Sequence, residues 1–203
     1  MKVLFQGDSI TDMGRDRSDF HDLGNGYAKY AARWLRHYCP EEEFEFIDLG
    51  ISGNKTSDLV ARWKTDCIDI APDILSILIG INDTWHRAGD KNWIPNDEFE
   101  NNYRTILEDA KKIDGIKIVM MEQFLLPRED WEYFREDIDP KIRITRKLAR
   151  EYADVFIPLD GLLEAEAIRI GDYHILSEDA VHPAVDGAKF IGQLWAEAVA
   201  EII

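Results

Sequence analysis

The sequence predicts an α/β fold, a three-layer α/β/α sandwich in which a parallel sheet lies between two layers of helices. Two observations predict it. Short apolar runs of strand length alternate with longer segments whose apolar residues recur at helical spacing, and most of the runs end in glycine or a small polar residue. Parallel strands also need crossover connections, which the intervening helices supply. The five expected strands span residues 2–6, 44–49, 74–79, 116–121 and 155–158.

The expected helices follow from periodicity and from start and stop signals. The clearest is 27–38, where apolar residues recur at i, i+3, i+4, i+7, i+8 and i+11 and Pro40 ends the helix. Further helices are expected from near Thr56 or Ser57, over 97–113 with Asn96 as its N-cap, over 141–152, over 159–170, and from about Pro183 to the end. The segments 12–25, 84–96 and 127–140 are expected to be loops, and loops of such length are usually functional or mobile.

A chain of 203 residues is most simply one domain, spanning 1–203. Its 40 acidic and 24 basic residues give a net charge of −16, which disfavours nucleic acid and anionic membrane surfaces as partners. Cys39 and Cys67 form neither a CxxC motif nor a disulfide framework, which suits a reducing compartment. The chain opens on an expected strand without a signal sequence, and no apolar run is long enough to span a bilayer. These features predict a cytoplasmic protein.

Ser9 follows the first strand, within Gly7-Asp8-Ser9-Ile10, and is expected at the carboxyl edge of the sheet, where α/β folds place ligands. A serine nucleophile needs a base and hydrogen-bond donors for the oxyanion. In a flavodoxin-like strand order of 2-1-3-4-5, the N–H groups of Ser9 and Gly53 and the side chain of Asn82 would converge there. The structural alternative is that Ser9 caps a helix with Asp12 as its capping-box partner, and that Gly53-Asn54 and Asn82 are turn residues.

His182 is the histidine best placed to act as the base, because Asp179 stands three residues before it and Pro183 follows it. An Asp-x-x-His turn can hold one ring nitrogen against the carboxylate and leave the other facing a hydroxyl. The alternative is a surface histidine near an acidic cap. No His or Asp spacing resembles a metal-ligand set, so no metal is expected.

Four blocks of the sequence, in order, resemble those of the SGNH (GDSL-like) hydrolases. They are Gly7-Asp8-Ser9-Ile10, with Ile10 where the family name has leucine, Gly53-Asn54, Gly80-Ile81-Asn82-Asp83 and Asp179-Ala180-Val181-His182-Pro183. The stretches Asp58-Leu59 and Ala61-Arg62-Trp63, together with Trp85, look similar to bacterial acetylxylan-esterase-like members. The resemblance implies an acetylesterase for carbohydrates such as xylo-oligosaccharides, free of cofactors and often oligomeric.

The expected site therefore has Ser9 as nucleophile, His182 as base and Asp179 as its orienting group, with Ser9, Gly53 and Asn82 as the oxyanion hole. Asp8 and Trp85 are expected to bind substrate, although Trp85 is equally suited to core packing. Three aromatic residues of the two long loops either stack on sugars or pack at a subunit interface; they are Trp93, Trp131 and Tyr133.

Two other functions stay open from the sequence. A lysophospholipase or thioesterase of the same family would need an apolar groove, and the charged loop 12–22 argues against one. A flavodoxin-like anion-binding module would need no Asp-x-x-His pair, and Asp8 would repel a phosphate. The expected partners are a small-molecule ester, expected to be an acetylated sugar, and further copies of the chain in a homo-oligomer.

Overall fold

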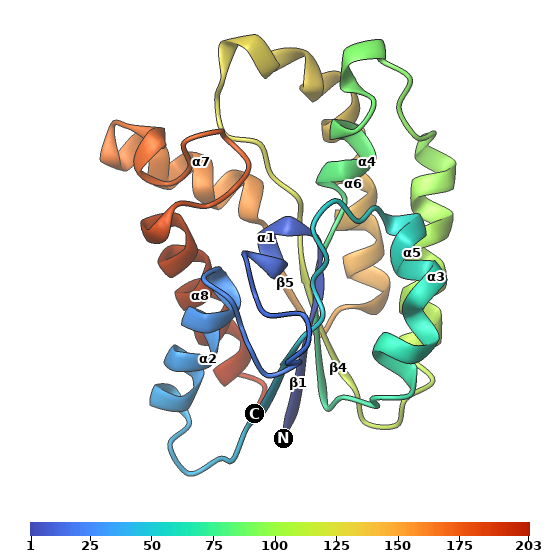
Figure 1. Ribbon diagram of the computed structural model, residues 1–203, viewed down its shortest axis with the longest axis vertical. Coiled ribbons are helices and arrows are strands. Elements are labelled where there is room, and N and C mark those ends of the chain that lie inside the picture. The colour runs from blue at the N-terminus through green and yellow to red at the C-terminus, as the bar shows by residue number, and fades with distance from the viewer.

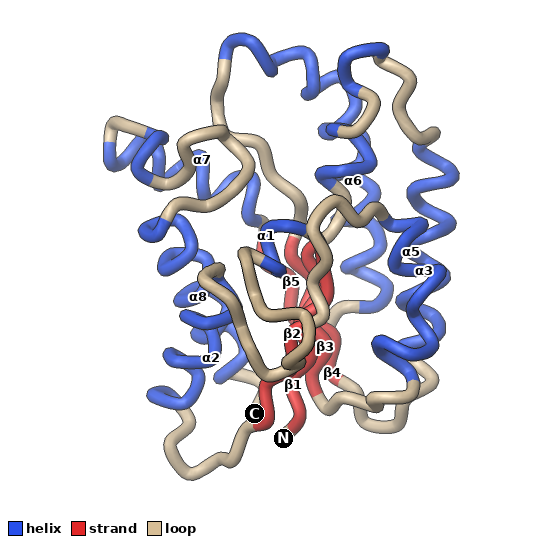
Figure 2. The backbone as a smooth tube through the Cα atoms, in the orientation of Figure 1, coloured by secondary structure: helices blue, strands red, loops and turns tan.

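The computed structural model describes residues 1–203, and its centre is one five-stranded parallel sheet (Figures 1 and 2). The strands are β1 (Lys2–Gly7), β2 (Glu45–Asp48), β3 (Ile74–Leu78), β4 (Lys117–Met121) and β5 (Val155–Ile157), in the order β2-β1-β3-β4-β5. Gly7 pairs with Leu78, and Leu78 pairs with Met121, so the carboxyl ends of the central strands lie level at one edge. The predicted fold class and strand order are confirmed.

Helices cover both faces of this sheet (Figure 1). One face carries α2 (Tyr27–Tyr38), α7 (Leu159–Ile170) and α8 (Val185–Ala200), and the other carries α3 (Thr56–Trp63), α5 (Asn96–Ala110) and α6 (Arg135–Tyr152). Two short helices, α1 (Ser9–Asp12) and α4 (Ile81–Trp85), start directly after β1 and β3. The remaining turns are the π-helix η1 (Lys64–Ile68) and the 3₁₀ helices η2 (Ala88–Asp90), η3 (Glu129–Phe134) and η4 (Tyr173–Ile175).

Two hydrophobic cores hold the layers together. Alternate residues of β1 point to opposite faces, so Phe5 joins the core beneath α2 and α8 whereas Leu4 joins the core beneath α3 and α5. Trp195 of α8 is fully buried, and its indole N–H donates to Ser76 Oγ of β3 at 2.9 Å. Burial of this kind on both faces explains why the strands read as nearly continuous apolar runs. None of the helices combines the length and apolar character needed to cross a bilayer.

Three local predictions are wrong. The sixth helix begins at Arg135 instead of residue 141, because Arg135 is anchored by Asp139 and Asp160 and Pro140 is accommodated inside the helix. Asn96 is the first residue of α5 and not its cap, since Pro95 holds the cap position and makes no side-chain cap bond. The expected loops at 84–96 and 127–140 contain helical turns, including η2 and η3.

Candidate active site

Ser9 is the first residue of α1, immediately beyond the edge of the sheet. Gly7 permits this sharp turn, because a Cβ there would lie 2.2 Å from Thr11 Oγ1 and 2.4 Å from the Leu78 carbonyl oxygen. The helix is capped by Asp8, whose Oδ1 accepts from the Ile10 N–H at 3.0 Å. The alternative in which Ser9 is the cap is therefore wrong, and the Ser9 hydroxyl is left for other partners.

The Ser9 hydroxyl forms a hydrogen bond with the His182 ring across 173 residues of sequence. Ser9 Oγ and His182 Nε2 are 2.8 Å apart. The other ring nitrogen of His182, Nδ1, lies 2.6 Å from Asp179 Oδ2. This continuous chain of hydroxyl, imidazole and carboxylate is the arrangement that activates serine nucleophiles, with Nδ1–H donating to the carboxylate and Nε2 accepting from the serine.

The turn that carries His182 is held by local contacts. Asp179 Oδ1 accepts from the backbone N–H groups of Val181 at 3.0 Å and His182 at 2.7 Å. Ala180 has a φ of 71°, in the left-handed region, which folds the chain back over the carboxylate. Ser177 Oγ donates to the His182 carbonyl at 2.8 Å. Sequence analysis assigned no role to Ser177, although its position two residues before Asp179 could have indicated one in this turn.

Asp179 and His182 shift each other's pKa in opposite directions. Partial burial alone would raise the pKa of Asp179, but the hydrogen bonds from the His182 ring and from two backbone N–H groups hold that pKa well below its usual range. The hydrogen bond to Asp179 raises the pKa of His182 above its ordinary value, against the opposing effect of burial. The carboxylate therefore stays ionised and stabilises the histidine after it takes a proton.

Three N–H donors lie at the ends of β1, β2 and β3. Ser9 starts α1, so its N–H has no acceptor within the helix. Gly53 has a φ of 85°, and its N–H makes no hydrogen bond within the chain. Asn82 is 7% exposed, and its Nδ2 donates to the Asn54 carbonyl at 3.1 Å, which leaves one amide hydrogen free. The strand order places these donors at adjacent ends of the sheet.

Two buried aspartates are sequence neighbours of these donors: Asp83 follows Asn82, and Asp8 precedes Ser9. Asp83 accepts from Thr56 Oγ1 at 2.6 Å and from the Thr56 N–H at 3.1 Å, which joins α4 to the start of α3, and burial raises the pKa of Asp83 to about 6. Asp8 is 1% exposed, its Oδ2 has no partner, and burial raises its pKa to about 7 despite the bond from Ile10. This burial leaves Asp8 little surface with which to contact a substrate.

Trp85 lies between the His182 ring and an aromatic cluster. Its ring centroid is 6.0 Å from that of His182 and 4.5 Å from that of Trp131, and Trp131 stacks on Phe134 at 5.5 Å. Trp93 and Tyr133 do not contact Trp85 or His182. Their rings instead lie within 6.0 Å of Lys91 Nζ. Of the three loop aromatic residues named from the sequence, Trp131 is thus the one that contacts Trp85, which in turn contacts His182.

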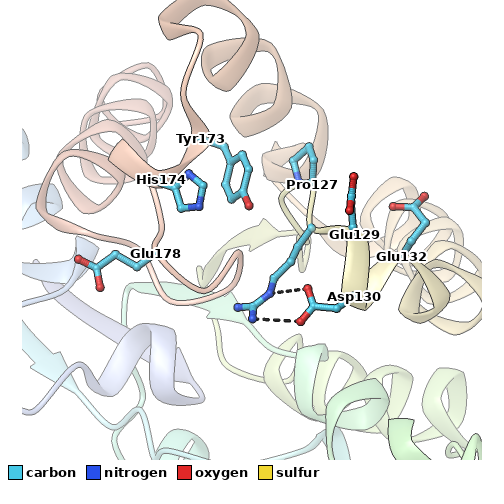
Figure 3. Close-up of a pocket in the computed structure, with 8 residues that line it drawn as sticks. Pro127, Glu129, Asp130, Glu132, Tyr173, His174 and Glu178 are labelled. Atoms are coloured by element: carbon cyan, nitrogen blue, oxygen red, sulfur yellow. Dashed lines mark hydrogen bonds and ion pairs between the residues drawn. The ribbon is translucent and has the colours of Figure 1, made fainter.

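A hollow of about 800 Å³ is lined by residues of the segments 127–132 and 173–178 (Figure 3). Its lining residues are Pro127, Arg128, Glu129, Asp130, Glu132, Tyr173, His174 and Glu178. The Arg128 guanidinium donates twice to the Asp130 carboxylate and lies 4.1 Å from the Trp131 ring centroid. The Tyr173 and His174 rings stack at 4.1 Å. Glu178, which lines the hollow, immediately precedes Asp179 in the sequence.

A smaller hollow of about 320 Å³ is lined in part by Asn82. Its lining is mostly charged or polar and consists of Lys55, Asn82, Asp83, His86, Arg87 and Ile94. No group of three or more His, Cys, Asp or Glu side chains in the structure is arranged to hold a metal ion.

Comparison with known proteins places this geometry in a family. Residues 5–190 match the model of the GDSL-like Lipase/Acylhydrolase family. An acetylxylan esterase from Geobacillus stearothermophilus is 32% identical over 207 residues, covering 98% of this chain and 93% of that protein. The chain therefore belongs to the GDSL-like lipase/acylhydrolase family, and it is an esterase of that family.

Solved structures agree with this assignment. A protein assigned as a GDSL-like lipase from Parabacteroides merdae has a TM-score of 0.87 at 33% identity, covering 97% of this chain and 94% of that one. Axe2, an acetylxylan esterase from Geobacillus stearothermophilus, has a TM-score of 0.82 at 32% identity, with coverage of 99% and 92%. Three further Axe2 structures are described as catalytic mutants, in which a serine, a histidine or an aspartate is replaced by alanine.

Proposed function

We propose that this esterase, as one domain spanning residues 1–203, removes acetyl groups from carbohydrates such as xylo-oligosaccharides through an acyl-enzyme on Ser9. The observation that carries the proposal is the hydrogen-bond chain from Ser9 Oγ through His182 to Asp179. The same three residue types are those replaced in the catalytic mutants of Axe2. The alternative of a non-catalytic binding module is not retained, because the family consists of hydrolases.

In the first half of the reaction, Ser9 Oγ attacks the acyl carbon while its proton passes to His182 Nε2. Asp179 keeps Nδ1–H in place and stabilises the imidazolium that forms. The carbonyl oxygen becomes an oxyanion, which accepts hydrogen bonds from the N–H groups of Ser9 and Gly53 and from Asn82 Nδ2. The ester C–O bond then breaks, and His182 gives the proton to the departing alcohol.

In the second half, water replaces the alcohol. His182 takes one proton from the water as its oxygen attacks the acyl carbon, and the same three donors hold the second oxyanion. The bond between Ser9 Oγ and the acyl carbon breaks, Oγ recovers the proton from His182, and the carboxylic acid leaves. Every proton is returned, so the cycle needs no cofactor.

The surroundings of His182 support a sugar as the alcohol. The alcohol must leave beside His182, and the hollow of Figure 3 is lined by Glu178, which precedes Asp179 in the turn that carries His182. Stacked rings at Tyr173 and His174, together with the Arg128–Asp130 pair, offer apolar ring faces and directional hydrogen bonds, which suit a sugar. We place Trp85 at the wall of the acyl pocket, where it favours a small acyl group.

Neither hollow favours a long acyl chain. Pro127 is the one aliphatic residue of the larger hollow, and Ile94 is the one apolar residue of the smaller. A fatty acyl group would have to leave charged side chains without water, which is costly. The charged lining thus favours acetate over the lipid and thioester substrates considered from the sequence.

The test has two arms, each corrected with Ser9→Ala as background. Hydrolysis of p-nitrophenyl esters should fall steadily from acetate to octanoate, and a preference for octanoate would defeat the acetyl assignment. Acetate release should be faster from acetylated xylo-oligosaccharides than from other acetylated sugars. Fast p-nitrophenyl acetate hydrolysis without release from any acetylated sugar would leave the esterase intact and refute the carbohydrate substrate.

The larger hollow can be tested separately. Tyr173→Ala should lower kcat/KM for acetylated oligosaccharides far more than for p-nitrophenyl acetate, whose leaving group is too small to reach across the hollow. Ile175→Ala is the matched control, because Ile175 is exposed in the same turn but does not line the hollow. Equal losses of both activities in Tyr173→Ala would contradict a role in sugar binding.

We further propose a cytoplasmic homo-oligomer. Cys39 and Cys67 are both free thiols, as in proteins of reducing compartments. Two exposed apolar side chains, Ile168 in α7 and Val185 at the start of α8, support this proposal, because exposed apolar groups of this kind favour subunit contacts. Light scattering after gel filtration would give the mass of the particle, and a monomer would refute the assembly.

A further inference from the structure

Arg62 lies in the last turn of α3, in contact with segments that carry the proposed oxyanion donors. Its side chain is 15% exposed, and each nitrogen of its guanidinium has a different partner. Nε donates to Asn54 Oδ1 at 2.9 Å, Nη2 to the Gly7 carbonyl at 3.4 Å, and Nη1 to Asp66 Oδ2 at 2.9 Å. One planar cation thus reaches the end of β1 and the turn after β2.

These partners belong to the segments that carry the three oxyanion donors. Gly7 leads through Asp8 into Ser9, and Asn54 directly follows Gly53. The Asn54 carbonyl is also the acceptor for Asn82 Nδ2, at 3.1 Å. Arg62 therefore contacts two of the segments directly and reaches the third through Asn54.

We propose that Arg62 is a positioning residue that fixes the three oxyanion donors relative to one another; this inference rests on the donors assigned under the proposed function. The turn at Gly53 adopts a positive φ, and the Gly53 N–H is not held by any internal hydrogen bond. Backbone hydrogen bonds from Asn54 to Ile51 and from Ile51 to Gly7 shape this turn, and the Asn54 side chain is the contact through which Arg62 orients it. A guanidinium suits the task because its donors form a rigid fork, which a lysine ammonium lacks.

The catalytic consequence follows from geometry. Oxyanion donors act only when they are aimed at the position that the oxyanion will occupy, and a displacement of about 1 Å can cost on the order of 10²-fold in rate. Without Arg62, the Asn54 side chain and the Gly7 carbonyl each lose a partner, so the turn after β2 can rotate away from Ser9. The ester would still bind, but its transition state would be held less well.

The test compares Arg62→Lys and Arg62→Ala with Asp66→Asn on p-nitrophenyl acetate, with thermal unfolding as a check on the fold. Both Arg62 variants should lose kcat by about 10- to 10²-fold with little change in KM, because the lost interactions act in the transition state. Asp66→Asn removes only the ion pair and should keep the wild-type kcat. Millimolar guanidinium should partly restore kcat in Arg62→Ala but not in Asn82→Ala.

A double-mutant cycle of Arg62→Lys with Asn82→Ala completes the test. If Arg62 acts by placing the donors, the double variant should lose less than the product of the two single losses. A wild-type kcat in a folded Arg62→Lys, or fully multiplicative losses, would overturn this inference while leaving the esterase mechanism in place. A wild-type kcat in Asn82→Ala would overturn the oxyanion assignment and this inference together.

Discussion

The two sides of the site are built in different ways. The base side is the turn 177–182 with the proposed base His182. Its contacts lie within that one short turn, and the side chains of His182 and Asp179 are 39% and 38% exposed. The oxyanion side is the region of the proposed oxyanion donors. Here Asn82 and Asp83 are 7% and 1% exposed, and their partners lie 27 or more positions away in sequence. The base side is local and half-exposed, whereas the oxyanion side is a buried polar network that joins several elements.

This difference predicts which substitutions should change the catalytic rate alone and which should also lower the stability of the fold. Partly exposed groups in a local turn can be altered with little cost to the fold, because water solvates what remains. A buried polar group that loses its partner is more costly, since its desolvation is no longer compensated. Changes on the base side should therefore affect rate and pH dependence alone, whereas changes on the oxyanion side should affect rate and unfolding together.

The largest effect is expected for Asp179→Asn. Asn keeps an oxygen for the Val181 and His182 backbone N–H groups, but it no longer stabilises the imidazolium or the correct tautomer of His182. We expect kcat on p-nitrophenyl acetate to fall about 10⁴-fold, as in other serine triads, with an unchanged thermal midpoint. A loss of less than tenfold would show that Asp179 does not orient the base.

The next effect in size is expected for Asn82→Ala. Loss of one oxyanion donor costs about 10²- to 10³-fold in kcat. Because Asn82 is buried and bonds the Asn54 carbonyl, the thermal midpoint should fall as well, in contrast to Asp179→Asn. Asn101→Ala, at an exposed position on α5, is the control and should change neither quantity. A normal rate with a lowered midpoint would assign Asn82 a structural role only.

A smaller effect is expected in the pH dependence of kcat/KM, which should change after a substitution on the base side and not after one on the oxyanion side. Only neutral His182 can accept the Ser9 proton, so kcat/KM should fall about tenfold per pH unit below its pKa. Since Asp179 raises that pKa, the fall should begin above the ordinary histidine range and should move to lower pH in Asp179→Asn. Asn82→Ala should keep the wild-type profile at a lower rate. A profile that stays put in Asp179→Asn would contradict the coupling.

The smallest effect concerns Asp8. Its pKa is raised from the unfolded value of 3.8 to about 7 by burial, so its contribution to stability is present below pH 4 and is lost as pH rises to 7. Asp8→Asn keeps a good N-cap and removes this titration. Its thermal midpoint relative to wild type should therefore be higher at pH 8 than at pH 4. A difference independent of pH would show that Asp8 does not titrate in this range.

The same contrast decides what could be predicted from sequence. The five strands and their order follow from apolar runs and the turns after them, and the pairing of Asp179 with His182 follows from their spacing. These features depend on neighbours in the chain, or on the strong rule that parallel strands share one edge. The family blocks then identify the class of enzyme.

The parts that could not be predicted depend on distant contacts. The bond from Arg62 to Asn54 and the early start of α6 at Arg135 depend on residues that only the fold brings together. Asp8 was assigned to substrate binding from the sequence, but its carboxylate caps α1 and is buried in the structure. Sequence spacing gives proximity and does not give direction.

The proposed mechanism depends above all on Ser9 as a nucleophile activated by His182, and labelling with a serine-directed phosphonate tests this most directly. Peptide mass spectrometry should find one label per chain, on Ser9, and the labelling rate should fall steeply in His182→Ala. Ester hydrolysis by a protein that carries no label on Ser9, or that keeps full activity after Ser9 is labelled, would contradict it.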